Sequence, residues 1–265
     1  MRAFVEGVGL LGPGLASWSS SRSVIAGAEP YRHAATVVTA SDLLPPAERR
    51  RTGLPVKLAL AAGREAFEHA ARHPSKTATV FTGSSGDGDT LHQICEVLAS
   101  AEREVSPTRF HNSVHNAAAG YWGIATRSQE ASTSLGCYDV SFAGGLLESM
   151  AQVVVDRKPV ALIAYDQPYP EPLHSVRRIG ASFAVALVLV PEATPAAFAS
   201  IEVELADEQR LPTRMSDPGL EAARSEIPAA RSLPLLGALA RRSEETVVLE
   251  YLDGTTLRVK ASPCA

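Results

Sequence analysis

The sequence predicts an α/β fold, and two of its features support this prediction. Short apolar segments alternate with longer segments in which apolar residues recur every three or four positions, as happens when strands and helices follow one another. Residues 160–165 and 181–190 are apolar enough to be strands buried on both faces at the centre of a sheet. The length of 265 residues and the hydrophobic content of 45% suit one globular domain, or at most two.

The N-terminal part of the chain is expected to alternate between strands and helices. Residues 4–11 are a predicted strand that a Gly-Pro-Gly turn closes, and the weakly patterned stretch after it contains one predicted strand at 35–39. Apolar residues at helical spacing predict a helix over 56–70, with a proline suited to its first turn. Residues 78–83 form an apolar predicted strand, and a helix over 89–101 follows it.

The middle of the chain continues this alternation. A helix is predicted over residues 113–126, and a short strand of small and β-branched residues follows over 130–134. Three- and four-residue spacing of apolar side chains predicts a helix over 138–155. The two apolar segments named above then complete the predicted sheet.

The last part of the chain differs in character. Residues 195–265 carry Ala-Pro and Arg-rich stretches, with a predicted strand at 200–205 and a predicted hairpin around Asp253-Gly254. We therefore expect a main domain over residues 1–194 and a divergent C-terminal segment over residues 195–265.

Composition and charge exclude several classes of function. The net charge is −4 and no basic stripe interleaved with aromatic residues is present, which argues against a nucleic-acid partner. Three scattered cysteines without metal spacing read as reduced thiols. The longest apolar runs are too short to span a membrane, and Glu6 interrupts the apolar start where a signal peptide would be continuous. We therefore expect a cytoplasmic protein without a membrane span.

The stretch from Ala131 to Asp139 has the pattern of a strand that turns directly into a buried helix. The unpaired N–H groups and the dipole at such a helix start lower the pKa of a thiol and bind a developing anion, so the turn suits a nucleophile. The residue at the turn is Leu135, which has no nucleophilic group.

Several motifs in order carry a resemblance to a known family. They are a glycine-rich first strand, the strand that ends in Thr82-Gly83-Ser84-Ser85-Gly86, then Ser106-Pro107-Thr108-Arg109-Phe110, the segment Asn112 to Gly120, and Ser132-Thr133-Ser134. Together, from about Phe4 to Val190, they resemble the N-terminal half of a β-ketoacyl synthase. The resemblance implies a thiolase-like fold of three layers, α-β-α, with a short divergent C-terminal extension.

The departures from this family bear on the activity. A working synthase of this family carries cysteine where this chain has Leu135, and its second half brings two catalytic histidines. His174 is the last histidine here, so those groups are missing as well. Without them, neither acyl transfer nor carbanion stabilisation is available by the family's mechanism, and the chain is not expected to be an enzyme on its own.

What the chain is similar to instead is a chain-length factor, the silent partner of an active synthase in type II polyketide systems, including aryl polyene and related pigment and fatty-acid-type pathways. This resemblance implies a heterodimer with an active β-ketoacyl synthase, which acyl carrier protein supplies with acyl chains, and it implies no cofactor. The implied contact is a strand edge made of Ser132, Thr133 and Ser134.

The resemblance also implies which residues border the acyl tunnel at that interface. They are Phe110, Val114, His115 and Ala118. Ordinary packing in a buried helix is the competing interpretation, because aromatic residues at helical spacing usually belong to a core.

Three alternatives stay open at this stage. Cys137 lies two residues after the expected nucleophile position and could make the chain an autonomous thiolase-like acyltransferase. Residues 7–12 match the GxGxxG string of dinucleotide sites, but the required helix does not follow. His111 and His115 are four residues apart, yet no third ligand is evident, so no metal site is expected.

Overall fold

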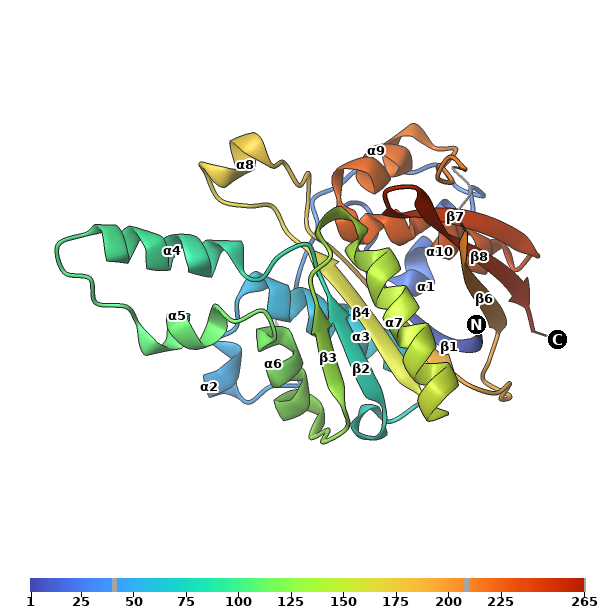
Figure 1. The fold of residues 1–265 in the computed structure, drawn as a ribbon, viewed down its shortest axis with the longest axis horizontal. Coiled ribbons are helices and arrows are strands. Elements are labelled where there is room, and N and C mark those ends of the chain that lie inside the picture. The colour runs from blue at the N-terminus through green and yellow to red at the C-terminus, as the bar shows by residue number, and fades with distance from the viewer. Residues whose placement is uncertain (40–41, 207–209, 265) are drawn as a thin grey trace.

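A computed structural model describes residues 1–39, 42–206 and 210–264 (Figure 1). These residues form one eight-stranded sheet with the order β3-β2-β4-β5-β1-β6-β8-β7. The strands are β1 (Arg2–Leu11), β2 (Ala78–Thr82), β3 (Ser132–Leu135), β4 (Val160–Asp166), β5 (Phe183–Val190), β6 (Ala199–Ala206), β7 (Glu245–Leu252) and β8 (Thr255–Pro263). β2 pairs in parallel with β3 and β4, and the remaining pairs are antiparallel.

Helices cover both faces of this sheet. They are α1 (Trp18–Ile25), α2 (Pro46–Arg49), α3 (Leu54–His69), α4 (Gly88–Ala99), α5 (Pro107–Asn112), α6 (Ala117–Thr126), α7 (Ser141–Asp156), α8 (Leu173–Val176), α9 (Pro218–Glu226) and α10 (Leu233–Arg241). Short 3₁₀ turns are η1 (Pro74–Lys76), η2 (Tyr138–Val140) and η3 (Pro228–Ser232).

The central strands separate two hydrophobic cores. Along β4, Val160 and Leu162 belong to the core beneath α7 and α10, whereas Ala161 and Ile163 belong to the core beneath α3 and α6. Every residue of β4 is therefore buried, which is why its sequence is apolar up to Asp166 at its end. The predicted layered α/β fold is confirmed.

Two glycines of the GxGxxG string let α3 lie directly on β1. A Cβ atom on Gly7 would lie 2.0 Å from the carbonyl oxygen of Ala66, and one on Gly9 would lie 1.9 Å from that of Ala62. No side chain fits in either place, so these glycines allow a close helix–strand contact. The first helix after the string begins only at Trp18, and the string has no phosphate-binding turn.

The predicted helix over 113–126 is wrong in its bounds. Its residues 117–126 form α6 and its residues 113–116 are a turn, while the short helix α5, expected as loop, precedes that turn. Buried Asn112 explains the break: its amide donates to the carbonyl oxygen of Arg51 at 2.6 Å and its side-chain oxygen accepts the hydroxyl of Tyr121 at 3.1 Å. Propensity and spacing do not reveal such long-range bonds.

Two other predicted elements differ as well. Residues 35–39 are irregular and not a strand, although Thr36 donates its hydroxyl to the carbonyl oxygen of Ser182 at 2.7 Å. The predicted helix over 138–155 begins with the 3₁₀ turn η2, and the backbone of Tyr138 has φ +53°. A tight turn is needed to redirect the chain from β3 into α7.

The C-terminal part continues the same sheet. β6 pairs with β1 and with β8, and a hairpin at Asp253-Gly254 joins β7 to β8. The predicted strand and hairpin are thus present, while the domain boundary at residue 194 stays a prediction.

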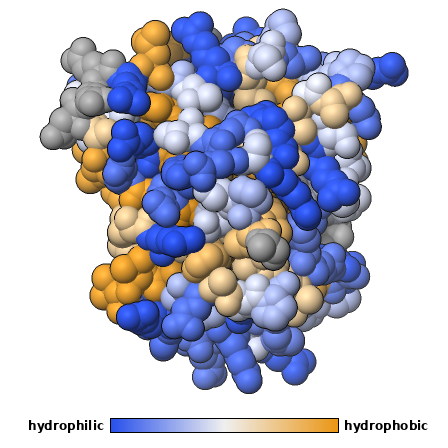
Figure 2. Space-filling model, turned by 90° about the vertical axis from the view of Figure 1, so that its right-hand side faces the viewer, coloured by the Kyte–Doolittle hydropathy of each residue, from blue (hydrophilic) through white to orange (hydrophobic). Residues whose placement is uncertain are grey.

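The two ends of the molecule differ in surface character. The end that carries both termini, at the right of Figure 1, is largely hydrophilic, with apolar side chains along one margin (Figure 2). At the other end, α4, α5 and α8 project beyond the sheet and carry large exposed apolar side chains, which are Leu91, Leu98, Phe110, Leu173 and Val176. We call these five residues the apolar arm set. No helix in the described ranges is long and apolar enough to cross a membrane.

Candidate functional site

The carboxyl ends of three parallel strands meet at one place in the fold. β3 ends at Leu135, β2 ends at Thr82 and β4 ends at Asp166, and α7 starts just beyond β3. In α/β sheets, ligand and catalytic groups gather at this edge. The turn from β3 into α7 is therefore the candidate site.

Two donors of the turn form hydrogen bonds within it. The backbone N–H of Cys137 donates to the hydroxyl oxygen of Ser141 at 3.1 Å, and that hydroxyl donates to the carbonyl oxygen of Tyr138 at 2.7 Å. Leu135 is half-buried and packs against the core beneath α7. The position that the resemblance gives to a nucleophile thus holds an aliphatic side chain, and the Cys137 amide beside it donates to Ser141.

Cys137 lies beside this turn but has a packing role. A Cβ atom on Gly144 would lie 2.9 Å from the Cys137 sulfur, so the thiol rests on α7 where the glycine leaves space. The thiol makes no hydrogen bond to any described residue, and no histidine nitrogen is within that range. A catalytic cysteine is normally activated by an adjacent base, and the described residues place none beside this thiol.

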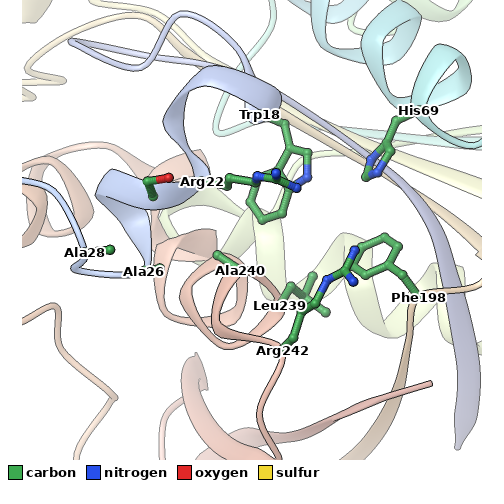
Figure 3. Close-up of a pocket in the computed structure, with 10 residues that line it drawn as sticks. Trp18, Arg22, Ala26, Ala28, His69, Phe198, Leu239, Ala240 and Arg242 are labelled. Carbon is green, nitrogen blue, oxygen red and sulfur yellow. The ribbon is translucent and has the colours of Figure 1, made fainter. Parts of the chain in front are cut away.

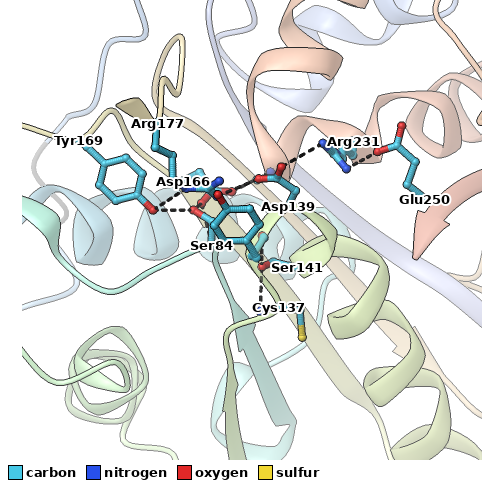
Figure 4. Close-up of polar contacts among 11 residues, drawn as sticks. Ser84, Cys137, Asp139, Ser141, Asp166, Tyr169, Arg177, Arg231 and Glu250 are labelled. Carbon is cyan, nitrogen blue, oxygen red and sulfur yellow. Dashed lines mark hydrogen bonds and ion pairs between the residues drawn. The ribbon is translucent and has the colours of Figure 1, made fainter. Parts of the chain in front are cut away.

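A series of alternating arginine and carboxylate side chains lies over the turn (Figure 4). The guanidinium of Arg177 lies 3.4 Å from the ring centre of Tyr138 and donates to Asp139 at 2.8 Å. Asp139 also lies 3.6 Å from Arg231, which in turn pairs with Glu250 of β7. The C-terminal segment is thus tied to the candidate site through alternating charges.

The buried carboxylate of Asp166 links two segments of the candidate site. One oxygen accepts the backbone N–H and the hydroxyl of Ser84, at 2.9 and 2.6 Å, and the other accepts the N–H of Ala229 at 2.7 Å. Burial raises the pKa of Asp166 to about 6, although these bonds act in the opposite direction. Through these three donors, the buried carboxyl connects the loop after β2 to η3.

The residues that the resemblance places at a tunnel come partly together. Val114, His115 and Ala118 line a narrow crevice of about 10 Å³, and His115 also borders a hollow of about 380 Å³ between α4 and the segment before α8. Phe110 lines neither space and is 67% exposed. Of these four residues, Ala118 is buried, as the core-packing interpretation expects, while the tunnel assignment stays a prediction.

His115 lies close to the turn after β3. A Cβ atom on Gly136 would be 3.5 Å from two atoms of the His115 ring. His115 thus borders both the crevice and Gly136, the residue after Leu135.

β3 lies at one end of the sheet. Thr133 and Leu135 face β2 in the parallel ladder, so the backbone groups of Ser132 and Ser134 point outward by the alternation of strand geometry. Within the described ranges, no strand pairs with that outward edge. Exposed edges of this kind pair readily with another chain.

The charged residues over the turn were not identified from the sequence. Asp166 stands at the end of an apolar strand, and a polar residue in that position is a usable signal. Arg177, Arg231 and Glu250 lie far apart in the chain and carry no local pattern that would predict their meeting. In the described ranges, no group of three histidine, cysteine or carboxylate side chains could hold a metal ion.

Comparison with known proteins gives a match to one family and matches to several solved structures. The family described as "Beta-ketoacyl synthase, N-terminal domain" matches residues 17–248. No curated protein matches the sequence.

Solved structures match over nearly the whole chain. A chain in the complex of the ketosynthase ApeO with its chain length factor ApeC from Xenorhabdus doucetiae is 21% identical, with a TM-score of 0.74 and coverage of 98% of this chain and 99% of that one. The ishigamide ketosynthase/chain length factor gives 15% identity, a TM-score of 0.73 and coverage of 100% and 99%. A chain of AntDE:AntF, a type II PKS acyl-carrier protein in complex with its ketosynthase, is 11% identical, with a TM-score of 0.75 and coverage of 99% of each chain. At these identities the likeness concerns the fold.

Proposed function

The chain belongs to the family of β-ketoacyl synthase N-terminal domains, and we propose that it is a non-catalytic subunit of the chain-length-factor type. It pairs with an active β-ketoacyl-ACP synthase and forms part of the wall of the tunnel that holds the growing chain. The pathway is of the aryl polyene or a related polyketide or fatty-acid type, and we expect it in the cytoplasm.

The observation that carries this proposal is the turn after β3. Leu135 stands where the family resemblance places the nucleophile, and the Cys137 amide beside it donates to the side chain of Ser141. Acyl transfer at such a turn needs a nucleophile and free donors for the developing oxyanion. Leu135 has no nucleophilic group and the N–H of Cys137 already donates to Ser141, so the contribution of the chain is contact and shape.

The edge of β3 supports a paired state. Its outward backbone groups, at Ser132 and Ser134, are suited to a strand of a second subunit, and pairing removes an edge that would otherwise favour aggregation. The apolar arm set lies at the same end of the molecule and offers apolar area for burial in the same interface. The fold neighbours come from complexes of ketosynthases with chain length factors, and one of them includes an acyl carrier protein.

The tunnel would reach this chain at the crevice next to Gly136. His115 and Ala118 border it, and the side chain of Val114 is half-exposed beside them. A bulky residue here sets the depth available to an acyl chain, and a small one extends it.

Co-expression with candidate synthases tests the proposal. A tag on this chain is expected to recover an active synthase in a one-to-one complex, and the complex, but not the isolated chain, is expected to elongate malonyl units. If the isolated chain elongates them and Cys137→Ala abolishes this, the chain is an autonomous acyltransferase and the proposal is wrong.

A further inference from the structure

A second hollow lies far from the β3 edge. It has a volume of about 520 Å³ and lies between α1, the last turn of α3 and the end of α10 (Figure 3). Its main lining side chains are Trp18, Arg22, His69, Phe198 and Arg242. His69 is bonded to β1 and Phe198 directly precedes β6, and β1 is four strands away from β3 in the sheet.

The hollow carries two positive charges without a carboxylate partner. Neither Arg22 nor Arg242 forms an ion pair with a residue of the described ranges, and the Arg242 guanidinium lies 6.0 Å from the ring centre of Phe198. Glu65 lies one turn before His69, but both of its oxygens accept backbone N–H groups, from Trp18 at 2.7 Å and from Leu10 at 2.8 Å. It is thus fully engaged in holding α1 and β1.

His69 contributes a third donor. Its Nδ1 atom accepts the backbone N–H of Val8 at 3.0 Å, which leaves the ring proton on Nε2. Burial lowers the pKa of His69, and the charges of Arg22 and Arg242 lower it further, so the ring is neutral at pH 7. Figure 3 shows Arg22, His69 and Arg242 reaching toward the same space.

Apolar surface completes the hollow. Phe198 stacks on His69 with ring centres 5.4 Å apart, and Trp18, Leu239 and Ala240 line the remaining walls. A volume of this size is within the usual range for small-molecule sites, which combine apolar walls with a few directed polar groups.

We propose that this hollow binds a small phosphomonoester whose organic part is apolar or planar. Two guanidinium groups balance the double negative charge of the phosphate and donate to its oxygens in pairs, and the imidazole N–H supplies a further donor. The organic part rests on Phe198, Trp18 and Leu239. This site does not involve the β3 edge, so a negative result for phosphomonoester binding would leave the proposed function untouched, and the reverse also holds.

Calorimetric titration of the full chain with phenyl phosphate tests the proposal, on the isolated chain or on its complex. One phenyl phosphate is expected to bind per chain, more tightly than inorganic phosphate or benzoate. Arg22→Gln and Arg242→Gln are each expected to weaken binding by about tenfold, as the loss of a charge-assisted contact does. Arg50→Gln, which changes another exposed arginine without an ion pair among the described residues, is expected to have no effect.

Three results would overturn the proposal. They are the absence of phenyl phosphate binding at millimolar concentrations, unchanged binding in the double variant of Arg22 and Arg242, and equal or tighter binding of benzoate. Because both arginines are exposed, the unfolding midpoints of the variants without ligand are expected to match that of the parent protein, which separates lost binding from lost folding.

Discussion

The guanidinium of Arg177 lies 3.4 Å from the ring centre of Tyr138, and the same group donates to Asp139, the next residue in the chain. Both contacts hold η2, the turn that leads from β3 into α7. Tyr138 has a backbone φ of +53°, which costs energy for a residue with a side chain. The stacked cation offsets that cost, so the turn is a braced structural junction with a charged cover.

From the close contact of α3 with β1 we predict that a side chain at Gly9 lowers the stability of the fold. Gly9→Ala puts a methyl group 1.9 Å from the carbonyl oxygen of Ala62, so α3 must move, and we expect a loss of about 3 kcal/mol or more in the free energy of unfolding. Gly120→Ala is the matched control. It lies in the exposed middle of α6 with nothing within 4 Å of the new atom, and it is expected to gain up to about 1 kcal/mol. Urea denaturation measures both, and equal effects would contradict the contact.

The crevice beside Gly136 makes a prediction about product length. Ala118→Phe fills it at a packing cost of about 1–3 kcal/mol, and Val114→Phe narrows it from a half-exposed position at a lower cost. Both variants are expected to shorten the product of the assembled complex, as measured by mass spectrometry. Ile124→Phe, on α6 but outside the crevice, is expected to leave the length unchanged. Unchanged lengths in both test variants, with the complex intact, would remove these residues from the tunnel.

The outward edge of β3 makes a prediction about assembly. Ser134→Pro removes an outward N–H without removing a bond to β2, so binding of the synthase is expected to fall by at least about tenfold while the unfolding midpoint changes little. Thr133→Pro removes a bond within the chain's own sheet and is expected to lower the midpoint as well. Full binding by Ser134→Pro would place the partner elsewhere.

Asp166 makes a prediction about pH. Its pKa is raised to about 6 from 3.8, so the folded state holds a proton that the unfolded state has lost between these values. Stability therefore falls as the pH rises from about 4 to about 6, and a shift of about two pH units corresponds to roughly 3 kcal/mol. Asp166→Asn is less stable throughout, because its amide N–H₂ faces the N–H of Ala229. The stability difference between parent and variant should shrink over that pH range in denaturation curves, and a constant difference would show that Asp166 does not titrate there.

Local pattern predicts most of the sheet but not its irregular connections. The apolar runs of β4 and β5 could be read from the sequence because burial on both faces determines their composition, and the C-terminal hairpin because Asp253-Gly254 favours a tight turn. The break between α5 and α6 could not, since it depends on the bonds of Asn112 to Arg51 and Tyr121. Nor could the irregular course of residues 35–39, which a contact with Ser182 holds.

The candidate site likewise contains parts that the sequence predicts and parts that it does not. The turn at Leu135 follows from the strand-turn-helix pattern of neighbouring residues, whereas the missing nucleophile there and the edge role of Ser132 to Ser134 were implied by the family resemblance. The contacts of Arg177, Arg231 and Glu250 over the turn join three distant parts of the chain, so only the tertiary structure reveals them. Asp139, which pairs with Arg177 and Arg231, is the one member of this group that lies within the predicted turn.

Intact-mass measurement of both subunits after incubation with acyl-loaded carrier protein tests the central claim most directly. The synthase is expected to gain the mass of the acyl group on its own cysteine, while the mass of this chain stays unchanged in the parent and in Cys137→Ala alike. An acyl adduct on this chain that disappears in Cys137→Ala would contradict the account.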